Sequence, residues 1–189
     1  MAGFVLLALV VAGLIYVAVI YNGLVNLKHG VEKAWANVDV LLKQRHDELP
    51  KLIETCKQYM QFERGTLERV MAARAALNAA RGSGDVNAVG AAEGVMRVGL
   101  GTLLATAEAY PELKSNQSIQ QLIARVTGLE NAIGDRRELY NETVNANNVR
   151  IEQFPDVVVA RFLKFQPATL LHFSVEETAD IDMRALFGR

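Results

Sequence analysis

The chain has 189 residues, of which 51% are hydrophobic and only 7% aromatic, and its formal net charge is −1. This composition, with few prolines, favours helices packed through Leu, Val and Ala over a β-sandwich. A near-neutral balance of mixed charges argues against a nucleic-acid-binding surface. The single cysteine, Cys56, excludes a disulfide framework within these residues. We therefore expect one all-α domain with appendages.

The N-terminal segment predicts a membrane anchor over residues 1–27. It contains no charged side chain, and FVLLALVVAGLIYVAVIY is a nearly unbroken apolar run. About 20 such residues in a helix cross the ~30 Å hydrocarbon layer. A cleaved signal peptide is the competing interpretation, but it needs a basic start and a small-x-small cleavage site, and the sequence shows neither.

Basic residues next to this span predict its orientation. Lys28 and Lys33 follow it, whereas no basic side chain precedes it. The positive-inside rule then places the N-terminus outside and the rest of the chain in the cytoplasm.

The helical period continues beyond the span without a linker. It predicts a first helix that is continuous with the anchor and reaches about Arg81, bent at Pro50, and ended by the cap residues of RGSGD. A second helix is expected over 85–109 and a third over 118–153. The third stops at Phe154-Pro155, and a short helix, DVVVARFL, follows. Short connections predict an antiparallel up-down bundle over 28–163, with three long helices and a short C-terminal one, then a partly extended tail over 164–189.

The second of these helices is rich in glycine, at Gly90, Gly94, Gly99 and Gly101. Each glycine costs a helix up to about 1 kcal/mol relative to alanine. We therefore expect a close approach of another helix at these positions.

A dense set of residues resembles the signature of the LemA family of bacterial membrane-anchored helical proteins. The resemblance covers about residues 21–173, although the C-terminal IDMRALFGR departs from the family pattern. The signature residues in this sequence are Asn22, Trp35, Asn37, Asp39, Arg45, His46, Asp47, Pro50, Glu130, Arg137, Tyr140, Asn141 and Pro155.

The resemblance implies a helical bundle on an N-terminal anchor in the bacterial inner (cytoplasmic) membrane, with the short N-terminus outside. It implies no defined activity. Some family members are similar in context to partners of HtpX-type membrane zinc proteases or of other envelope machinery, so a partner role follows from the resemblance.

The Arg45-His46-Asp47 triplet is the clearest candidate for chemistry, but its spacing does not suit a metal site or a nucleophile. His46 and Asp47 are adjacent, so on a helix their side chains point about 100° apart. Cys56 lies nearly three turns, or ~15 Å, from His46. We therefore predict no catalytic residue, no metal and no cofactor.

The structural interpretation of Arg45 is a buried, paired charge. It stands at a seam position between Leu42 and Leu49, where a charge must be paired. We expect Glu130 or Glu108 as its partner, and Asp39 or Asp47 as the partner of Arg137. Such a polar layer would fix which helix faces meet.

The function that fits these features is a non-catalytic scaffold. We expect the bundle to bind a protein partner in the membrane or further copies of itself, with no nucleic acid and no small-molecule substrate. A membrane-remodelling or lipid-surface role is the alternative. An enzyme using Arg45, His46 and Asp47 is a further one, and it would need these groups in an open cleft.

Overall fold

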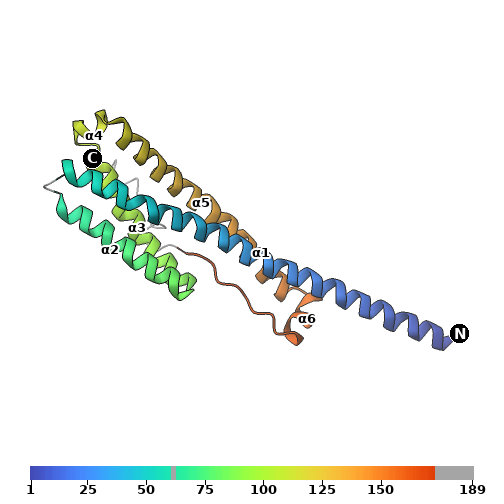
Figure 1. The fold of residues 1–189 in the computed structure, drawn as a ribbon. Coiled ribbons are helices and arrows are strands. Elements are labelled where there is room, and N and C mark those ends of the chain that lie inside the picture. Colours follow the sequence, from blue (N-terminus) through green and yellow to red (C-terminus); the bar gives the residue numbers. More distant parts are fainter. Residues whose placement is uncertain (61–62, 173–189) are drawn as a thin grey trace, which may run out of the picture. The chain divides into compact units, whose positions relative to one another are not determined.

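In the computed structural model, residues 1–60 and 63–172 are described, and among them the only regular secondary structure is helical (Figure 1). This confirms the predicted all-α class. The elements are α1 (Ala2–Tyr59), α2 (Arg64–Ser83), α3 (Val86–Ala107), α4 (Pro111–Ser115), α5 (Gln117–Glu152) and α6 (Asp156–Phe162). They form two compact units, one of residues 1–40 and 134–170 and the other of residues 41–133 with 171 onward.

The apolar start of α1 has no protein packed around it. Every side chain from Met1 to Val19 is exposed, and Ile20 is the first buried one. Both α1 and α3 are long and apolar enough to cross a membrane, but only 6% of the most apolar window of α1 is buried, against 39% for α3. The contrast favours α1 as the membrane-associated helix and α3 as a core helix.

The predicted extent of the first helix was wrong, because α1 ends at Tyr59 and a separate helix begins at Arg64. The row of apolar residues along one face of the predicted helix has no member between Met60 and Leu67 among the described positions. Gly65 also weakens a helix there. Met60 is buried, and its carbonyl accepts a hydrogen bond of 3.1 Å from the Glu63 N–H. In the second unit α1, α2, α3 and α5 therefore alternate in direction (Figure 1).

The other predicted boundaries are confirmed to within two residues. Gly84 ends α2 in the left-handed conformation, at φ 71°. Asp85 caps α3 by accepting hydrogen bonds from the Asn87 N–H at 2.9 Å and the Ala88 N–H at 3.4 Å. Between the second and third predicted helices lies the short helix α4, which has Pro111 in its first turn and buries Leu113.

In the first unit, α6 packs against α1 and α5. A cluster of buried apolar residues joins the three helices: Ile20, Leu24, Ile151, Val159 and Ala160. The buried Asp156 carboxylate accepts a hydrogen bond from Arg150 of α5. This ion pair and the cluster fix α6 beside the start of the bundle.

The chain after α6 is extended and held to α5, as predicted for the first part of the tail. The Tyr140 hydroxyl donates to the Thr169 carbonyl at 2.8 Å. Asn148 accepts from the Ala168 N–H at 2.8 Å and donates to its carbonyl at 2.9 Å. Residues 173–189, which include the acidic part of the predicted tail, lie outside the described residues.

In the second unit, α2 packs against α3 around an aliphatic core shared with α1 and α5. Its fully or almost fully buried members are Leu42, Leu49, Leu52, Val70, Met96, Leu100, Leu103 and Val126.

The glycines of α3 have different neighbours. A Cβ on Gly99 would lie 3.5 Å from Val70 Cγ2, so α2 approaches α3 closely there, as expected. A Cβ on Gly90 would lie 2.1 Å from the His172 carbonyl oxygen, so this glycine admits the extended chain rather than a helix. Gly101 is exposed, with nothing within 4 Å.

These neighbours predict opposite effects for two glycine-to-alanine substitutions in α3. Gly101→Ala should raise the free energy of unfolding by up to about 1 kcal/mol, because alanine favours the helix and meets no neighbour. Gly90→Ala should lower it by about 1–3 kcal/mol, because the new Cβ displaces a backbone carbonyl. Thermal unfolding of both variants in the same detergent provides the measurement. A stabilised Gly90→Ala variant would contradict the close approach of His172.

Candidate functional site: a buried ionic layer and a proline joint

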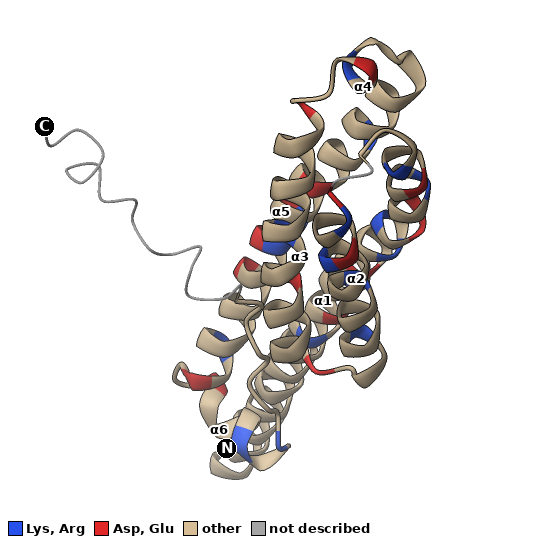
Figure 2. Ribbon diagram, turned by 90° about the vertical axis from the view of Figure 1, so that its left-hand side faces the viewer, with Lys and Arg blue, Asp and Glu red and all other residues tan. Residues whose placement is uncertain are grey.

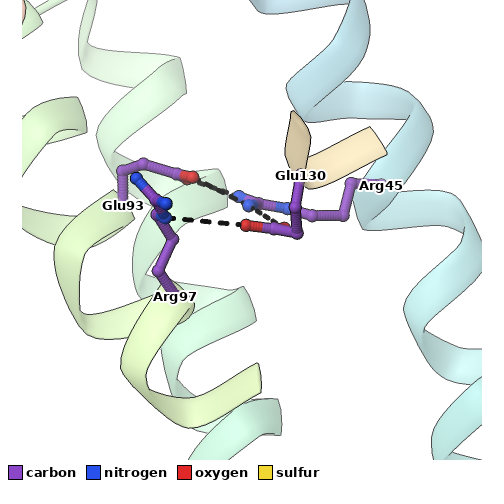
Figure 3. A network of polar contacts seen from close by, with 4 residues as sticks. All are labelled: Arg45, Glu93, Arg97 and Glu130. Atoms are coloured by element: carbon purple, nitrogen blue, oxygen red, sulfur yellow. Dashed lines mark hydrogen bonds and ion pairs between the residues drawn. The ribbon is translucent and has the colours of Figure 1, made fainter. Parts of the chain in front are cut away.

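Arg45 of α1 is fully buried and bound by carboxylates from two other helices. Its Nη1 donates to Glu93 of α3 at 2.7 Å and to Glu130 of α5 at 2.5 Å, and its Nη2 donates to the second oxygen of Glu93. Arg97 of α3 lies 3.9 Å from the other oxygen of Glu130 (Figure 3). Two cations and two carboxylates thus form an ionic layer within the second unit, which we define as Arg45, Glu93, Arg97 and Glu130.

The electrostatics of the layer keep Arg45 charged. Burial acts to lower its pKa, but the hydrogen bonds and negative charges of Glu93 and Glu130 outweigh this effect, and the pKa is raised. Burial raises the pKa of Glu93, and the hydrogen bond and charge of Arg45 offset this only in part. Glu93 is therefore the member of the layer that the fold makes hardest to keep ionised.

The predicted pairing of Arg45 is confirmed for Glu130 but missed Glu93. Glu108, the other expected partner, is exposed in the turn after α3. A signal for Glu93 is present in the sequence: Val89, Glu93 and Met96 follow the spacing of four and three that marks the buried face of α3. A charge on that face needs an opposite charge on a neighbouring helix.

His46 and Pro50 form a second polar feature together with Arg74 of α2. In a regular helix the N–H of residue 50 would donate to the His46 carbonyl, but proline has no N–H. Arg74 Nε donates to that carbonyl at 3.0 Å, and its Nη2 lies 2.8 Å from His46 Nε2. The guanidinium supplies the missing donor, so the freed carbonyl becomes an attachment point between α1 and α2, which we call the proline joint.

The histidine of the proline joint acts as an acceptor. Its pKa is lowered, first by burial and then by the positive charge of Arg74, with Asp47 acting weakly in the other direction. A neutral imidazole can accept the Arg74 N–H at Nε2, whereas a protonated one cannot. The distance between Arg74 and His46 and the lowered pKa of His46 thus both indicate a structural contact between these two side chains.

Aromatic and amide members of the predicted set lie in the first unit. Trp35 and Tyr140 pack with ring centroids 5.4 Å apart, and burial raises the pKa of Tyr140. Asn22 and Asn37 are exposed on α1.

The predicted pairing of Arg137 with Asp39 or Asp47 stays a prediction. Asn141 is half-buried, Asp47 is exposed, and Pro155 lies between α5 and α6.

The Arg45-His46-Asp47 triplet does not lie in an identified cavity. Cavities of about 500, 640 and 520 Å³ are present, and none of the three is lined by Arg45, His46 or Asp47. Burial raises the pKa of the Cys56 thiol to about 11, which leaves it protonated and unreactive. Within the described part of the chain, no three His, Cys, Asp or Glu side chains are grouped so as to hold a metal ion.

An exposed apolar N-terminal helix that continues into a bundle with a buried ionic layer defines a class of helical, membrane-associated protein. The model of the LemA family matches residues 34–184, which is most of the chain, and the protein belongs to that family. The resemblance seen in the sequence is thereby confirmed, although its first part, residues 21–33, precedes the matched region. No curated protein matches the chain at the threshold applied.

Arg45→Met should lower the free energy of unfolding by about 3–5 kcal/mol, because it leaves Glu93 buried without its cation. Arg45→Met combined with Glu93→Met should recover most of that loss, because both buried charges are removed. Arg125→Met, which removes an exposed arginine paired with Glu48 at 3.2 Å, is the control and should cost less than about 1 kcal/mol. Denaturant unfolding of the natural protein and the three variants measures these free energies. An equal loss of stability in Arg45→Met and in the double variant would contradict the ionic layer.

A double-mutant cycle tests the proline joint. Arg74→Met should cost about 1–2 kcal/mol in the natural background, because the His46 carbonyl loses its donor. In a Pro50→Ala background the restored helical N–H can satisfy that carbonyl, so the same substitution should cost about 1 kcal/mol less. Arg69→Met, another arginine of α2, should cost the same in both backgrounds. An Arg74→Met cost that is independent of residue 50 would disprove the joint.

Proposed function

We propose that this protein is a non-catalytic, single-pass membrane scaffold whose helical bundle binds a protein partner at the membrane or further copies of itself. The observation that carries the proposal is the continuity of α1. It is one helix from Ala2 to Tyr59, exposed and apolar as far as Val19 and built into the protein core from Ile20 onward. A binding module rooted in the bilayer without a linker is suited to presenting a surface at the membrane.

The position of the bundle follows from charge. Lys28 and Lys33 are the first basic side chains after the apolar run, which favours the cytoplasmic side of a bacterial inner membrane and an external N-terminus.

The signature residues support a structural rather than a catalytic role. Arg45 is bound through both Nη atoms by two carboxylates and has no exposed surface. His46 is engaged by Arg74, and Asp47 is exposed on α1 away from any of the three cavities described above. An enzyme built on this triplet would need at least one of these groups available to a substrate in a cleft.

A groove on the second unit supports partner binding. It holds about 520 Å³ between α2 and α3 and combines small residues with exposed valines: Ala72, Ala73, Ala76, Val95, Val98 and Gly99. Small side chains let another helix approach closely, and apolar ones at helical spacing provide anchors for it. A membrane protease or a second copy of the chain could supply such a helix.

Purification of the anchored protein in mild detergent, with mass measurement of the complex, tests the proposal. We expect a mass above that of the monomer, and we expect Val98→Glu to reduce it by placing a charge in the groove. Val40→Glu is the control, because Val40 on α1 is exposed to a similar extent and lies outside the groove; this substitution should leave the complex intact. A monomer with no co-purifying membrane protein would overturn the scaffold role.

A further inference from the structure

The short helix α6 exposes large apolar side chains. Val158 and Phe162 are four residues apart, so they share one face of the helix, and they are 61% and 84% exposed. Phe154, just before the helix, is 79% exposed. Val159 and Ala160, which turn toward α1 and α5 in the same helix, are buried. Several bulky apolar groups gathered on one short helix indicate a binding surface, whereas isolated ones would need no explanation.

This helix lies at the level where the apolar span of α1 ends. Ile20 and Leu24 are the first buried side chains of α1, and they are buried in the cluster that includes Val159 and Ala160 of α6. About 20 helical residues cross the hydrocarbon layer, so a span that begins near Gly3 ends near Asn22. The exposed face of α6 is therefore beside the boundary between acyl chains and headgroups.

A basic pocket opens next to α6. It has a volume of about 640 Å³ and is lined by α1, by Asn147 of α5 and by the chain that follows α6. Val25 and Phe165 contribute apolar surface, and Lys28 and Lys164 contribute ammonium groups. Glu32, the carboxylate among its described lining residues, is bound by His29 at 2.8 Å. The charge balance of the pocket thus favours an anion.

We propose that α6 and this pocket form a binding site for an acidic phospholipid. Val158 and Phe162 contact the acyl region at the membrane interface, and Lys28 and Lys164 bind the headgroup phosphate. The inference rests on the membrane anchoring of the proposed function and adds a lipid-recognition role to it. The sequence alone offered only Lys28 and Lys33 beside the span, balanced by Glu32, whereas the fold adds Lys164 from 136 positions further along the chain.

The placement of α6 is tested with the full chain in lipid nanodiscs. A polarity-sensitive fluorophore is attached to Val158→Cys, since the buried Cys56 thiol does not react. We expect its emission to shift to shorter wavelength and to be quenched by lipids with brominated acyl chains. Val40→Cys is the control, because Val40 is 53% exposed on α1 and lies 18 helical residues beyond the expected end of the span at Asn22. Equal quenching at the two positions, with the protein still in the nanodisc, would refute the role of α6 but leave the anchor intact.

The headgroup contact is tested by lipid retention. Phosphatidylglycerol should be retained by the purified protein in preference to phosphatidylcholine, and Lys28→Gln and Lys164→Gln should each reduce this preference about fivefold. Lys33→Gln, which changes a neighbouring lysine outside the pocket, should have a smaller effect. Loss of the preference in Lys33→Gln alone, or competition by inorganic phosphate as strong as that by the lipid, would overturn the proposed site.

Discussion

Burying the Arg45 guanidinium removes it from water, and the second unit replaces the lost hydration with carboxylates from two other helices. Desolvation of such a charge costs several kcal/mol, so the pairing contributes little net stability. What it contributes is selectivity, because a packing of α1, α3 and α5 that separated Arg45 from Glu93 would leave both charges buried and unpaired. The surrounding leucines can pack in several registers, whereas the ionic layer permits one. Figure 2 marks where the acidic and basic residues lie along the helices.

The proline joint shows a second way in which a local defect specifies tertiary structure. Pro50 removes a hydrogen bond from α1, yet the helix continues through it to Tyr59. The freed His46 carbonyl is satisfied from α2, so a loss within one helix becomes a contact between two. The signature triplet and its proline thus have structural contacts: Arg45 pairs with carboxylates in the core, and the His46 carbonyl accepts a hydrogen bond from α2.

The N-terminal end of α1 is suited to different surroundings from the rest of the helix. The side chains of residues 1–19 are exposed and apolar, which suits an environment of lipid better than one of water. The buried core of the first unit begins at Ile20, where this run ends, and α6 exposes further apolar side chains next to it. In the proposed arrangement, the exposed apolar surface of α6 and two lysines would keep the protein in contact with the membrane beyond its anchor.

The sequence by itself determined the helical class, the apolar span, the caps at Gly84 and Asp85, and the need of Arg45 for a partner, because periodicity, hydropathy and a charge on an apolar seam are local properties. It could not determine that α1 ends at Tyr59, because its seam pattern resumes in α2. Only tertiary structure selected Glu93, joined Arg74 to the His46 carbonyl, and placed Lys164 and Lys28 in the lining of one pocket. These contacts join residues far apart in the chain, and their partners are chosen by packing and not by spacing.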